Sequence, residues 1–405
     1  MRTLLLLVFP IALACSAQVT ENISFMHEGL AVNGTFAHPG TGGPYPTVLL
    51  MPGTGANDRD ITVTLAGANA QCLYPGLLGN TLKPFRDLSD ALVAGGFAVL
   101  RYDKVEYTYP DPAALGDITF TKLWLPAISA LDHLRTRNDV DAARISLVAH
   151  SEGSTLAPHV ALQDEGISAI VSLAGPRAPL DSLLARQLEY IATTCGGDVQ
   201  QAIAEGQQVM QYFAMIRAQQ WTAQTPALFG VPAPVWHQYI QMADAVAQNY
   251  SQTGLPTLFL GMQEDFNVPP VELQRFQNEL GDLAEYGSFP GLNHFLTNAT
   301  QPIVSELVTD SVVSWLTARM NAVGIADHAM GQKPLSATAT EQGLWITGLH
   351  QGSNEIVIHD AGGRIIHTAT LRADGPLEIP VPAGGMVIVQ ARHSDILRSV
   401  RVIIP

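Results

Sequence analysis

Short apolar runs alternate with longer amphipathic stretches over most of the chain between residues 20 and 320. The apolar runs are typical of buried strands, and the amphipathic stretches have the spacing of helices. We expect strands at 23–26, 30–37, 48–51, 97–100, 145–148, 169–173, 256–261 and 284–289, and helices at 83–94, 123–137, 154–163, 271–280 and 302–320. Residues 69–79 have the composition of a loop. This alternation predicts an α/β fold with a mostly parallel sheet covered by helices on both faces.

The alternation stops between about residues 177 and 253. This segment has no convincing strand and is rich in Gln, Ala, Met and aromatic residues, so we expect several helices. A helical insertion at this point of an α/β sheet is expected to form a lid over a site at the sheet edge. Most of its aromatic side chains should form its own core, and a few should line an apolar pocket.

The composition changes again after Met320. Residues 321–340 are small and polar and are expected to form a linker. From Leu344 onwards apolar strands are separated by tight turns, such as Ala361-Gly362-Gly363 and Ala383-Gly384-Gly385. Residues 341–405 are therefore predicted to form a small antiparallel β-sandwich. The main α/β domain is expected at 18–320.

The N-terminal residues have the pattern of a targeting segment. Arg2 supplies the positive charge, Leu4 to Leu13 form an apolar run too short to cross a bilayer, and Cys15-Ser16-Ala17 offers small residues for cleavage before Gln18. We predict a signal peptide at residues 1–17. A lipid-anchored alternative through Cys15 is weaker, because Ala12 stands where leucine is preferred. The protein is expected to pass through the periplasm and to be secreted or displayed at the cell surface, with no membrane span.

Composition and cysteine content narrow the function classes. Of the 405 residues, 47% are apolar and 14% charged, and the net charge is −15. An acidic protein is a poor match for nucleic acid or an anionic membrane. After cleavage only Cys72 and Cys195 remain, in a compartment that permits disulfides. They would form one disulfide or stay as two unrelated buried thiols, and the sequence leaves both alternatives open.

The stretch around Ser151 carries the clearest chemistry. A buried strand at 145–148 is followed by Ala149-His150-Ser151-Glu152-Gly153 and then by the helix at 154–163. A serine on a tight turn between a strand and a helix is typical of a nucleophile elbow, whose neighbours two positions away must be small. Gly153 and, less usually, Ala149 satisfy this requirement. The alternative is a helix N-cap serine without chemistry.

The loop after the strand at 48–51 reads Pro-Gly-Thr-Gly-Ala-Asn-Asp-Arg-Asp from Pro52 to Asp60. Glycines there allow backbone N–H groups to turn towards a ligand. We expect an oxyanion hole formed by the N–H of Thr54 or Gly55 together with that of Glu152. The alternative is an ordinary glycine-rich turn. The charged residues 58–60 are expected to form a structural ion-pair cluster beside the site rather than to contact substrate.

Two further residues complete a catalytic constellation. Asp265 and His294 each follow the end of a predicted strand, and the chain order Ser151, Asp265, His294 is that of a hydrolase triad on an open sheet. Glu264 is the alternative acid. His150 is expected to point away from the nucleophile as a core or supporting residue. No zinc-protease, cysteine–metal, dinucleotide or P-loop pattern is present, so we predict no metal and no cofactor.

As a set, PGTGANDRD, VLRYDK, AHSEGSTLAP, LGMQEDFNVP and PGLNHFL resemble the exported α/β-hydrolase esterases of the EstD type, which are related to dienelactone-hydrolase-like enzymes. The resemblance covers roughly residues 20 to 320. It implies an α/β-hydrolase fold, a triad of Ser151, Asp265 and His294, an oxyanion hole at Thr54 and Glu152, and a small ester substrate. The sequence VEYTYP after Lys104 departs from the family's Gly-rich turn, which bears on substrate preference.

The C-terminal segment resembles the sorting domain of the bacterial type IX secretion system, through the hairpin at 360–365 and the basic residues Arg398 and Arg401. This resemblance implies the secretion machinery as a partner. The alternative is an unrelated β-module that binds glycan or packs on the catalytic domain.

Three hypotheses follow for the whole chain. The first is a serine hydrolase that cleaves carboxylic esters through an acyl-enzyme. The second is a peptidase or amidase that uses the same triad, because acyl transfer to water has the same machinery for both bonds. The third is a non-catalytic binding protein that has kept the fold.

Overall fold

The computed structural model describes residues 18–111, 118–322, 336–340, 343–347, 349, 353–360, 364–372, 375–379, 385–393 and 396–404. They form two compact units that divide between Leu316 and Thr317. The predicted signal peptide, residues 1–17, and the central part of the predicted linker, residues 323–335, lie outside the described residues. In the part of the chain that is described, none of the helices has both the length and the apolar character needed to cross a bilayer.

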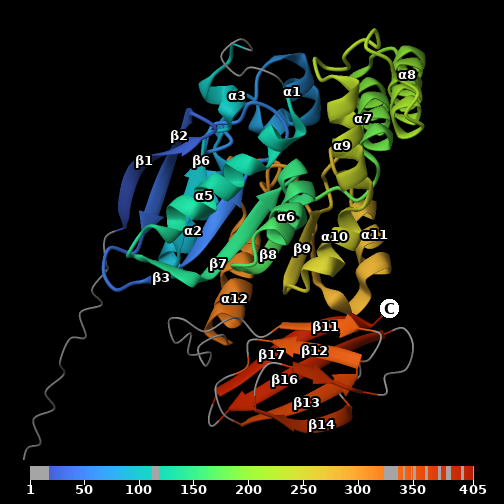
Figure 1. Ribbon diagram of the computed structural model, residues 1–405. Coiled ribbons are helices and arrows are strands. Elements are labelled where there is room, and N and C mark those ends of the chain that lie inside the picture. The colour runs from blue at the N-terminus through green and yellow to red at the C-terminus, as the bar shows by residue number, and fades with distance from the viewer. Residues whose placement is uncertain are drawn as a thin grey trace, which may run out of the picture. The chain divides into compact units, whose positions relative to one another are not determined.

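An eight-stranded sheet organises the first unit (Figure 1), in the order β1-β2-β6-β3-β7-β8-β9-β10. Its strands are β1 (Val19–His27), β2 (Leu30–His38), β3 (Tyr45–Met51), β6 (Ala98–Tyr102), β7 (Val140–His150), β8 (Ile167–Leu173), β9 (Thr257–Met262) and β10 (Glu285–Phe289). The pairs β1·β2 and β2·β6 are antiparallel, and every pair from β6 to β10 is parallel. The mostly parallel sheet predicted from the apolar runs is confirmed.

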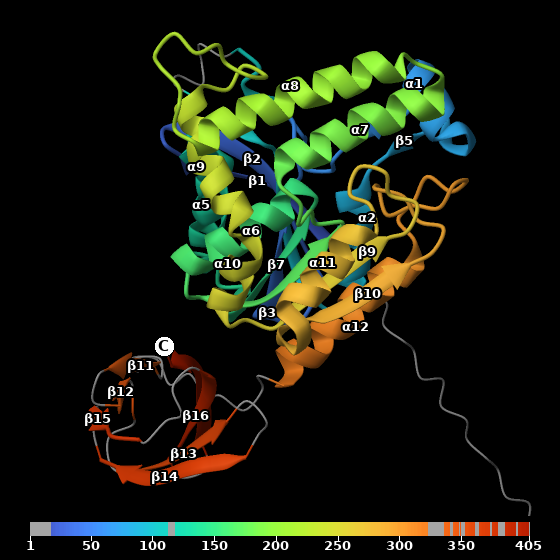
Figure 2. The same cartoon turned by 90° about the vertical axis from the view of Figure 1, so that its right-hand side faces the viewer.

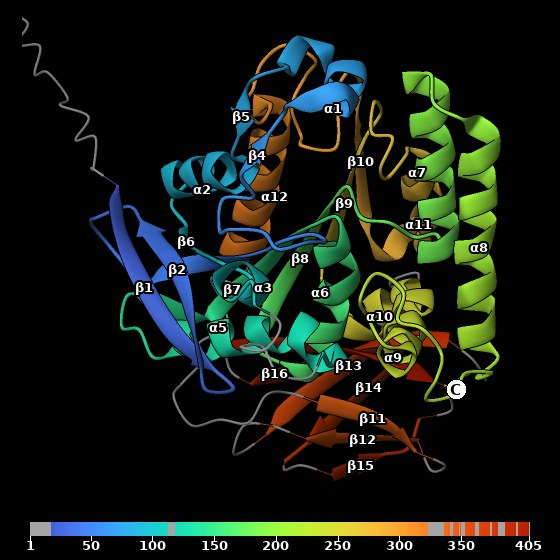
Figure 3. The same ribbon diagram turned by 90° about the horizontal axis from the view of Figure 1, so that it is seen from above.

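Helices cover the sheet on both faces (Figure 3). On one face lie α2 (Pro84–Ala94) and α12 (Glu306–Ala322), and on the other lie α5 (Leu125–Arg135) and α6 (Glu152–Gln163). In α2 the predicted apolar side chains Phe85, Leu88 and Leu92 are fully buried, because their spacing places them on one helical face. Buried strands between two helical layers are the α/β-hydrolase architecture that the sequence implies.

Several short elements were not predicted. The segment 69–79 is not a loop: it contains α1 (Gly67–Leu73) and a 3₁₀ turn, η1 (Pro75–Leu77). Their buried residues Ala70 and Leu77 pack with Leu65 and Leu82 in a small apolar cluster, so tertiary packing stabilises a helix that local composition does not favour. The remaining short elements are β4 (Val63–Thr64), β5 (Thr81–Leu82), α3 (Val105–Thr108) and η2 (Phe120–Leu123).

The predicted insertion is helical. It contains α7 (Leu180–Cys195), α8 (Val199–Arg217), α9 (Ala233–Asp244) and α10 (Val246–Thr253), and Figure 2 shows α7 and α8 side by side. A Cβ at Gly206 would lie 2.9 Å from the Cβ of Ala185, so glycine permits this close approach of the two helices. The expectation that the insertion has its own core is confirmed by a buried cluster of Val209, Phe213, Ile216, Ala233 and Ile240. After β9, the chain continues through α11 (Val271–Leu280), η3 (Gly281–Leu283) and β10.

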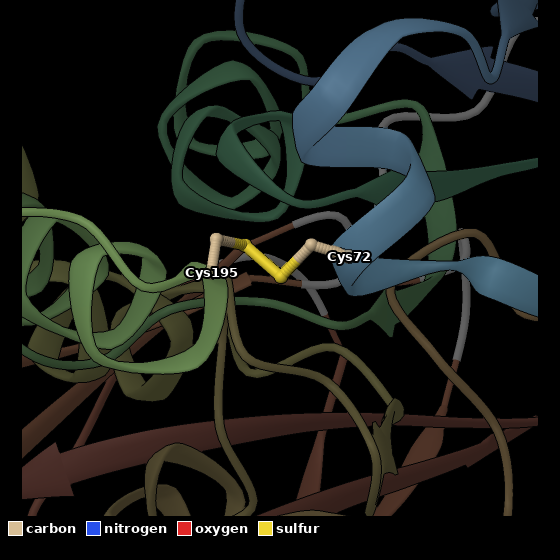
Figure 4. The surroundings of a disulfide bond; sticks show 2 residues. All are labelled: Cys72 and Cys195. Atoms are coloured by element: carbon tan, nitrogen blue, oxygen red, sulfur yellow. A yellow bond between two sulfur atoms is a disulfide. The ribbon is translucent and has the colours of Figure 1, made fainter.

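A disulfide joins the insertion to the rest of the first unit (Figure 4). Cys72, near the end of α1, is bonded to Cys195, the last residue of α7, with their Cα atoms 5.5 Å apart. The bond connects positions separated by 123 residues. Of the two alternatives that the sequence left open, the structure has the disulfide.

The second unit consists of two antiparallel sheets. One has the order β11 (Ser336–Thr340), β12 (Gly343–Thr347), β15 (Gly375–Leu377), and the other β14 (Ile365–Leu371), β13 (Asn354–Asp360), β16 (Gly385–His393), β17 (Ile396–Ile404). Side chains from both sheets, including Leu344, Ile346, Ile356 and Val389, share one apolar core. The predicted antiparallel β-module is confirmed, and β11 lies in a segment assigned above to the linker. The predicted turn at 361–363 and most of the turn at 383–385 lie outside the described residues, as do the side chains of Arg398 and Arg401.

Candidate active site

Ser151 lies on a tight turn between β7 and α6. Its backbone has φ 55° and ψ −124°, a conformation that non-glycine residues rarely adopt and that occurs at strained functional turns. The N–H of Ser151 donates to the carbonyl of Leu173 on the neighbouring strand β8 at 2.9 Å, which fixes the turn to the sheet. The strained serine therefore stands at the carboxyl edge of the sheet, where the elbow was predicted.

Glycines allow this turn to pack closely against the loop that follows β3. A Cβ at Gly153 would lie 2.5 Å from the carbonyl oxygen of Met51, and one at Gly53 would lie 2.9 Å from the Cβ of Ser151. Both approaches are too short for any side chain larger than hydrogen. Ala149 itself is fully buried at the end of β7. The expectation that positions around Ser151 must be small thus has a steric cause in this structure.

His294 and Asp265 are hydrogen-bonded to each other. The distance from His294 Nδ1 to Asp265 Oδ2 is 2.7 Å, and the second carboxylate oxygen accepts the N–H of Val268 at 2.9 Å. Asp265 is 2% exposed, so both of its oxygens are held away from water. Nδ1 is therefore occupied as a donor, which leaves Nε2 of His294 as the nitrogen able to accept a proton.

The loop that carries His294 is held by Asn293. The side-chain amide of Asn293 donates to Oγ1 of Thr297 at 2.9 Å, and its carbonyl oxygen accepts the N–H of Phe295 at 2.9 Å. Asn293 is buried and so is Thr297. This fixed loop sets the position of the imidazole, and Asn293 is a supporting residue that sequence reasoning did not identify.

Glu264, the alternative acid, is exposed, and its side chain has no hydrogen bond to His294 among residues 118–322. Its N–H donates to the carbonyl of Leu292 at 2.9 Å, so its backbone is held while its carboxylate faces solvent. The structure therefore pairs His294 with Asp265 and not with Glu264.

His150 does not point away from the site as expected. Nε2 of His150 lies 2.8 Å from the carbonyl oxygen of His294, and the two rings have centroids 4.7 Å apart. His150 is the last residue of β7, directly before the turn at Ser151, and it lines the same cavity as Ser151. Burial lowers the pKa of His150 to about 3, and the neighbouring His294 acts in the same direction. His150 is therefore a neutral ring that donates from Nε2 to the backbone of His294.

The loop after β3 lies beside Ser151 and is held from behind by side chains. The carbonyl of Gly53 accepts from Nδ2 of Asn57 at 3.0 Å and from Nζ of Lys104 at 3.2 Å. Asn57 also donates to the carbonyl of Thr54 at 3.0 Å. Lys104 is 8% exposed, and its Nζ lies 3.9 Å from a carboxylate oxygen of Glu152.

The N–H groups of Thr54 and Glu152 have no hydrogen-bond acceptor among residues 18–111 and 118–322. Glu152 is the first residue of α6, so its N–H also lies at the positive end of a helix dipole. Its carboxylate lies beside the hydroxyl of buried Tyr239, and burial together with this charge raises the pKa of Tyr239 well above its ordinary value. Gly55 has φ 97° and lies farther along the loop.

Arg59 and Asp60 form ion pairs, as predicted, whereas Asp58 accepts hydrogen bonds within the loop. Arg59 binds Asp103 with Nη2 2.6 Å from Oδ2, and Asp60 contacts Arg101 and Lys83. Asp58 accepts the N–H of Thr62 at 2.7 Å. These contacts fix the end of the loop, and residues 58–60 do not line the cavity above Ser151.

A cavity of about 320 Å³ brings the candidate residues together. Ser151, His150, His294, Thr54 and Glu152 all line it. Asp265 lies behind His294, outside the lining. Ser151 Oγ and the ring of His294 make no hydrogen bond in the described part of the chain. Such contacts often tighten only when substrate is bound. Of the predicted oxyanion residues, Thr54 and Glu152 reach this cavity, and Gly55 lines the adjoining one.

One group of metal-binding side chain types lies elsewhere in the first unit. Glu21, His38 and Asp139 place ligand atoms within 4.8 Å of one another. Nη2 of Arg137 lies 3.0 Å from the Glu21 carboxylate and 2.7 Å from that of Asp139, so an arginine already supplies the positive charge between them. We assign this group as an ion-pair network.

The comparison with curated proteins agrees with the esterase part of the resemblance seen in the motifs. No family model matches the chain. Among curated proteins it is similar to Esterase EstD of Thermotoga maritima, with 25% identity over an alignment of 310 residues that covers 72% of this chain and 68% of that protein. Among solved structures it is similar to Est1E from Butyrivibrio proteoclasticus, with 15% identity, a TM-score of 0.48 and coverage of 74% of this chain and 99% of that chain.

A second solved structure is the esterase Pf2001 from Pyrococcus furiosus, with 16% identity, a TM-score of 0.44 and coverage of 75% of this chain and 93% of that chain. The α/β-hydrolase fold itself rests on this chain's own strand order and on the position of the cavity at the carboxyl edge of its parallel strands.

Proposed function

We propose that the protein is an exported serine hydrolase that cleaves carboxylic esters through an acyl-enzyme. One observation carries the proposal: a serine on a strained turn lines the same cavity as a histidine whose Nδ1 is hydrogen-bonded at 2.7 Å to a buried aspartate. The similarity to Esterase EstD over 72% of the chain supports the ester as substrate class.

In the proposed reaction Ser151 Oγ attacks the carbonyl carbon of the ester, and its proton passes to Nε2 of His294. Asp265 holds the ring in the required tautomer and stabilises the imidazolium. The tetrahedral intermediate collapses, the C–O bond to the alcohol breaks, and His294 returns the proton to the leaving oxygen. Water then attacks the acyl-enzyme, gives its proton to His294, and the acid is released as Ser151 is protonated again.

The oxyanion is proposed to accept hydrogen bonds from the N–H groups of Thr54 and Glu152. In a trans peptide the C=O and the following N–H point in opposite directions. Lys104 and Asn57 hold the carbonyl of Gly53 from behind, so the N–H of Thr54 is turned towards the cavity. A cation on that carbonyl also polarises the peptide unit and strengthens its donor. Lys104 is thus a positioning residue for the oxyanion hole.

Export is part of the proposal. A disulfide between Cys72 and Cys195 is expected in an oxidising compartment, which agrees with the signal peptide predicted at residues 1–17. The C-terminal β-module is proposed to be the sorting domain of the secretion machinery, on the resemblance given above. Intact mass measurement of the secreted protein tests this: loss of residues from 341 onwards agrees with sorting, and retention of the whole module contradicts removal at export.

The reaction is tested with p-nitrophenyl acetate. Ser151→Ala should lower turnover on the order of 10⁶-fold, because the nucleophile is lost. Ser154→Ala is the matched control: its hydroxyl donates to the carbonyl of Ala149 at 2.9 Å and does not reach the cavity. It should keep turnover within about tenfold. Activity of Ser151→Ala near the wild-type rate would refute the proposal, and faster hydrolysis of an aminoacyl p-nitroanilide would indicate an amidase.

A further inference from the structure

A second cavity adjoins the one above Ser151. It has a volume of about 510 Å³ and lies under the helical insertion. Five residues line both cavities: Thr54, Glu152, Leu180, Leu184 and Tyr239. The larger cavity continues mostly between apolar side chains, among them Leu123, Phe229, Val235 and Trp236, and Lys104 and Glu106 also line it. His294 lines only the smaller cavity. We call the larger cavity the apolar chamber.

The position of His294 decides which half of an ester enters the chamber. His294 must protonate the leaving oxygen, so the alcohol lies on the side of the imidazole. The acyl carbonyl oxygen lies at the N–H groups of Thr54 and Glu152, which stand where the two cavities meet. The acyl chain then extends away from His294. We propose that the apolar chamber binds the acyl chain, and that the preferred substrates are esters of medium-length aliphatic acids such as octanoic acid. This inference rests on the proposed function.

Phe229 supports a ligand in the chamber independently. It lies in a turn in which Leu228 and Val231 exchange backbone hydrogen bonds of 2.9 and 3.2 Å, and Trp236 donates to the carbonyl of Leu228 at 3.1 Å. Phe229 has φ 53° and Gly230 has φ 78°. Positive φ suits glycine or asparagine at both positions, not a large aromatic residue.

The same phenylalanine is 65% exposed, although it lines the chamber. A strained, solvent-exposed aromatic side chain does not stabilise the fold, since it pays a conformational cost without burying its ring. Strain of this kind is typical of residues kept for contact with a ligand. An acyl chain in the chamber would cover the ring and supply the missing apolar contact. Phe229 is therefore inferred to determine specificity at the chamber mouth.

The test is a series of p-nitrophenyl esters from acetate to octanoate. Burial of each added methylene should raise kcat/KM roughly fourfold. Octanoate esters of a short alcohol should be cleaved at least about a hundredfold faster than acetate esters of octanol. The assignment would be overturned if kcat/KM did not depend on the length of the acyl chain, or if it depended on the length of the alcohol instead.

Three variants sharpen the test. Phe229→Gly should lower the ratio of octanoate to acetate kcat/KM about tenfold without lowering the midpoint of thermal unfolding, because glycine accepts this φ. Val235→Trp should lower the same ratio by filling the chamber. Met210→Ala is the matched control, an exposed apolar residue of the insertion that lines neither cavity, and should leave the ratio unchanged. The inference would be overturned if the ratio of octanoate to acetate kcat/KM in Phe229→Gly and in Val235→Trp equalled the ratio in the Met210→Ala control.

The two proposals fail differently. If acetate is cleaved through Ser151 but the acyl series is flat, the chamber has no role in acyl binding and the hydrolase stands. If no ester is cleaved and Ser151 resists a fluorophosphonate, the hydrolase itself fails.

Discussion

The carboxyl edge of the sheet and the helical insertion meet at the same cavity but are built by different means. At the sheet edge, Ser151, Asp265 and His294 each follow a strand of the mostly parallel sheet. The N–H of Ser151 donates to the carbonyl of Leu173 on β8, Asp265 accepts the N–H of Val268, and the carbonyl of His294 accepts from Nε2 of His150. The insertion is fixed by an apolar cluster of its own and by one disulfide. In the proposed reaction the chemistry depends on the sheet edge, and in the proposed acyl assignment the selectivity depends on the insertion that packs on it.

After the loss of the nucleophile in Ser151→Ala, the largest effect is expected at the buried end of the proposed triad. Asp265→Asn should lower kcat about 10⁴-fold, because the amide no longer holds the required tautomer of His294. Glu264→Gln is the matched control, since this exposed neighbour has no contact with the ring. Steady-state kinetics on p-nitrophenyl acetate measure both. A larger loss in Glu264→Gln than in Asp265→Asn would reverse the assignment of the acid.

The disulfide tests the other side of the comparison. Replacing Cys72 and Cys195 together by serine should lower the free energy of unfolding by up to about 5 kcal/mol, because the bond closes a loop of more than a hundred residues in the unfolded chain. Denaturant unfolding measures this, and the wild-type protein under reducing conditions should behave like the double variant. Selectivity for long acyl chains should weaken as well, since α7 carries Leu180 and Leu184. An unchanged unfolding midpoint would contradict the prediction.

Lys104 links the two regions from behind the oxyanion loop. Lys104→Met should lower kcat roughly 10²-fold with little change in KM, because an oxyanion-hole donor acts only in the transition state. Lys83→Met serves as control, since Lys83 pairs with Asp60 outside both cavities. A merely structural role of Lys104 would appear as lower stability or a higher KM, with kcat retained.

The smallest effect concerns pH. His150 is neutral in the fold, with its pKa lowered to about 3 by burial, whereas an unfolded chain binds a proton near pH ~6.5. The unfolded state therefore binds more protons below that pH, and His150 should cost roughly 2 kcal/mol of stability between pH 7 and pH 5. His150→Gln keeps a donor for the carbonyl of His294 and should reduce this pH dependence. Denaturant unfolding at pH 7 and pH 5 measures the free energy of unfolding of the wild-type protein and of His150→Gln. The same change between the two pH values in both proteins would contradict the prediction.

The sheet edge was readable from sequence because its determinants are local. A buried strand followed by a small-residue turn predicted the position of Ser151, and two further strand ends predicted those of Asp265 and His294. The sequence required a small residue at Gly153, and the structure gives the same reason, because a Cβ there would lie 2.5 Å from the carbonyl oxygen of Met51. For the insertion, the sequence predicted helices with a core of their own but not how they pack on the sheet edge.

What escaped prediction depends on contacts between distant segments. Lys104 and Asn57 meet at the carbonyl of Gly53, and His150 meets the backbone of His294 across 144 positions. The helix α1 forms because Ala70 and Leu77 pack with Leu65, and the strained turn at Phe229 depends on Trp236. Periodicity and composition contain no signal for such pairs. The two cysteines left the disulfide open for the same reason, since spacing along the chain does not determine distance in space.

The central claim is that Ser151 is a nucleophile activated by His294. The most direct measurement is covalent labelling with a fluorophosphonate, followed by intact mass and peptide mapping, in the wild-type protein and in His294→Ala. We predict one adduct per chain, located on Ser151, and much slower labelling in the variant. No adduct, an adduct on another residue, or equal labelling rates in both proteins would contradict the account.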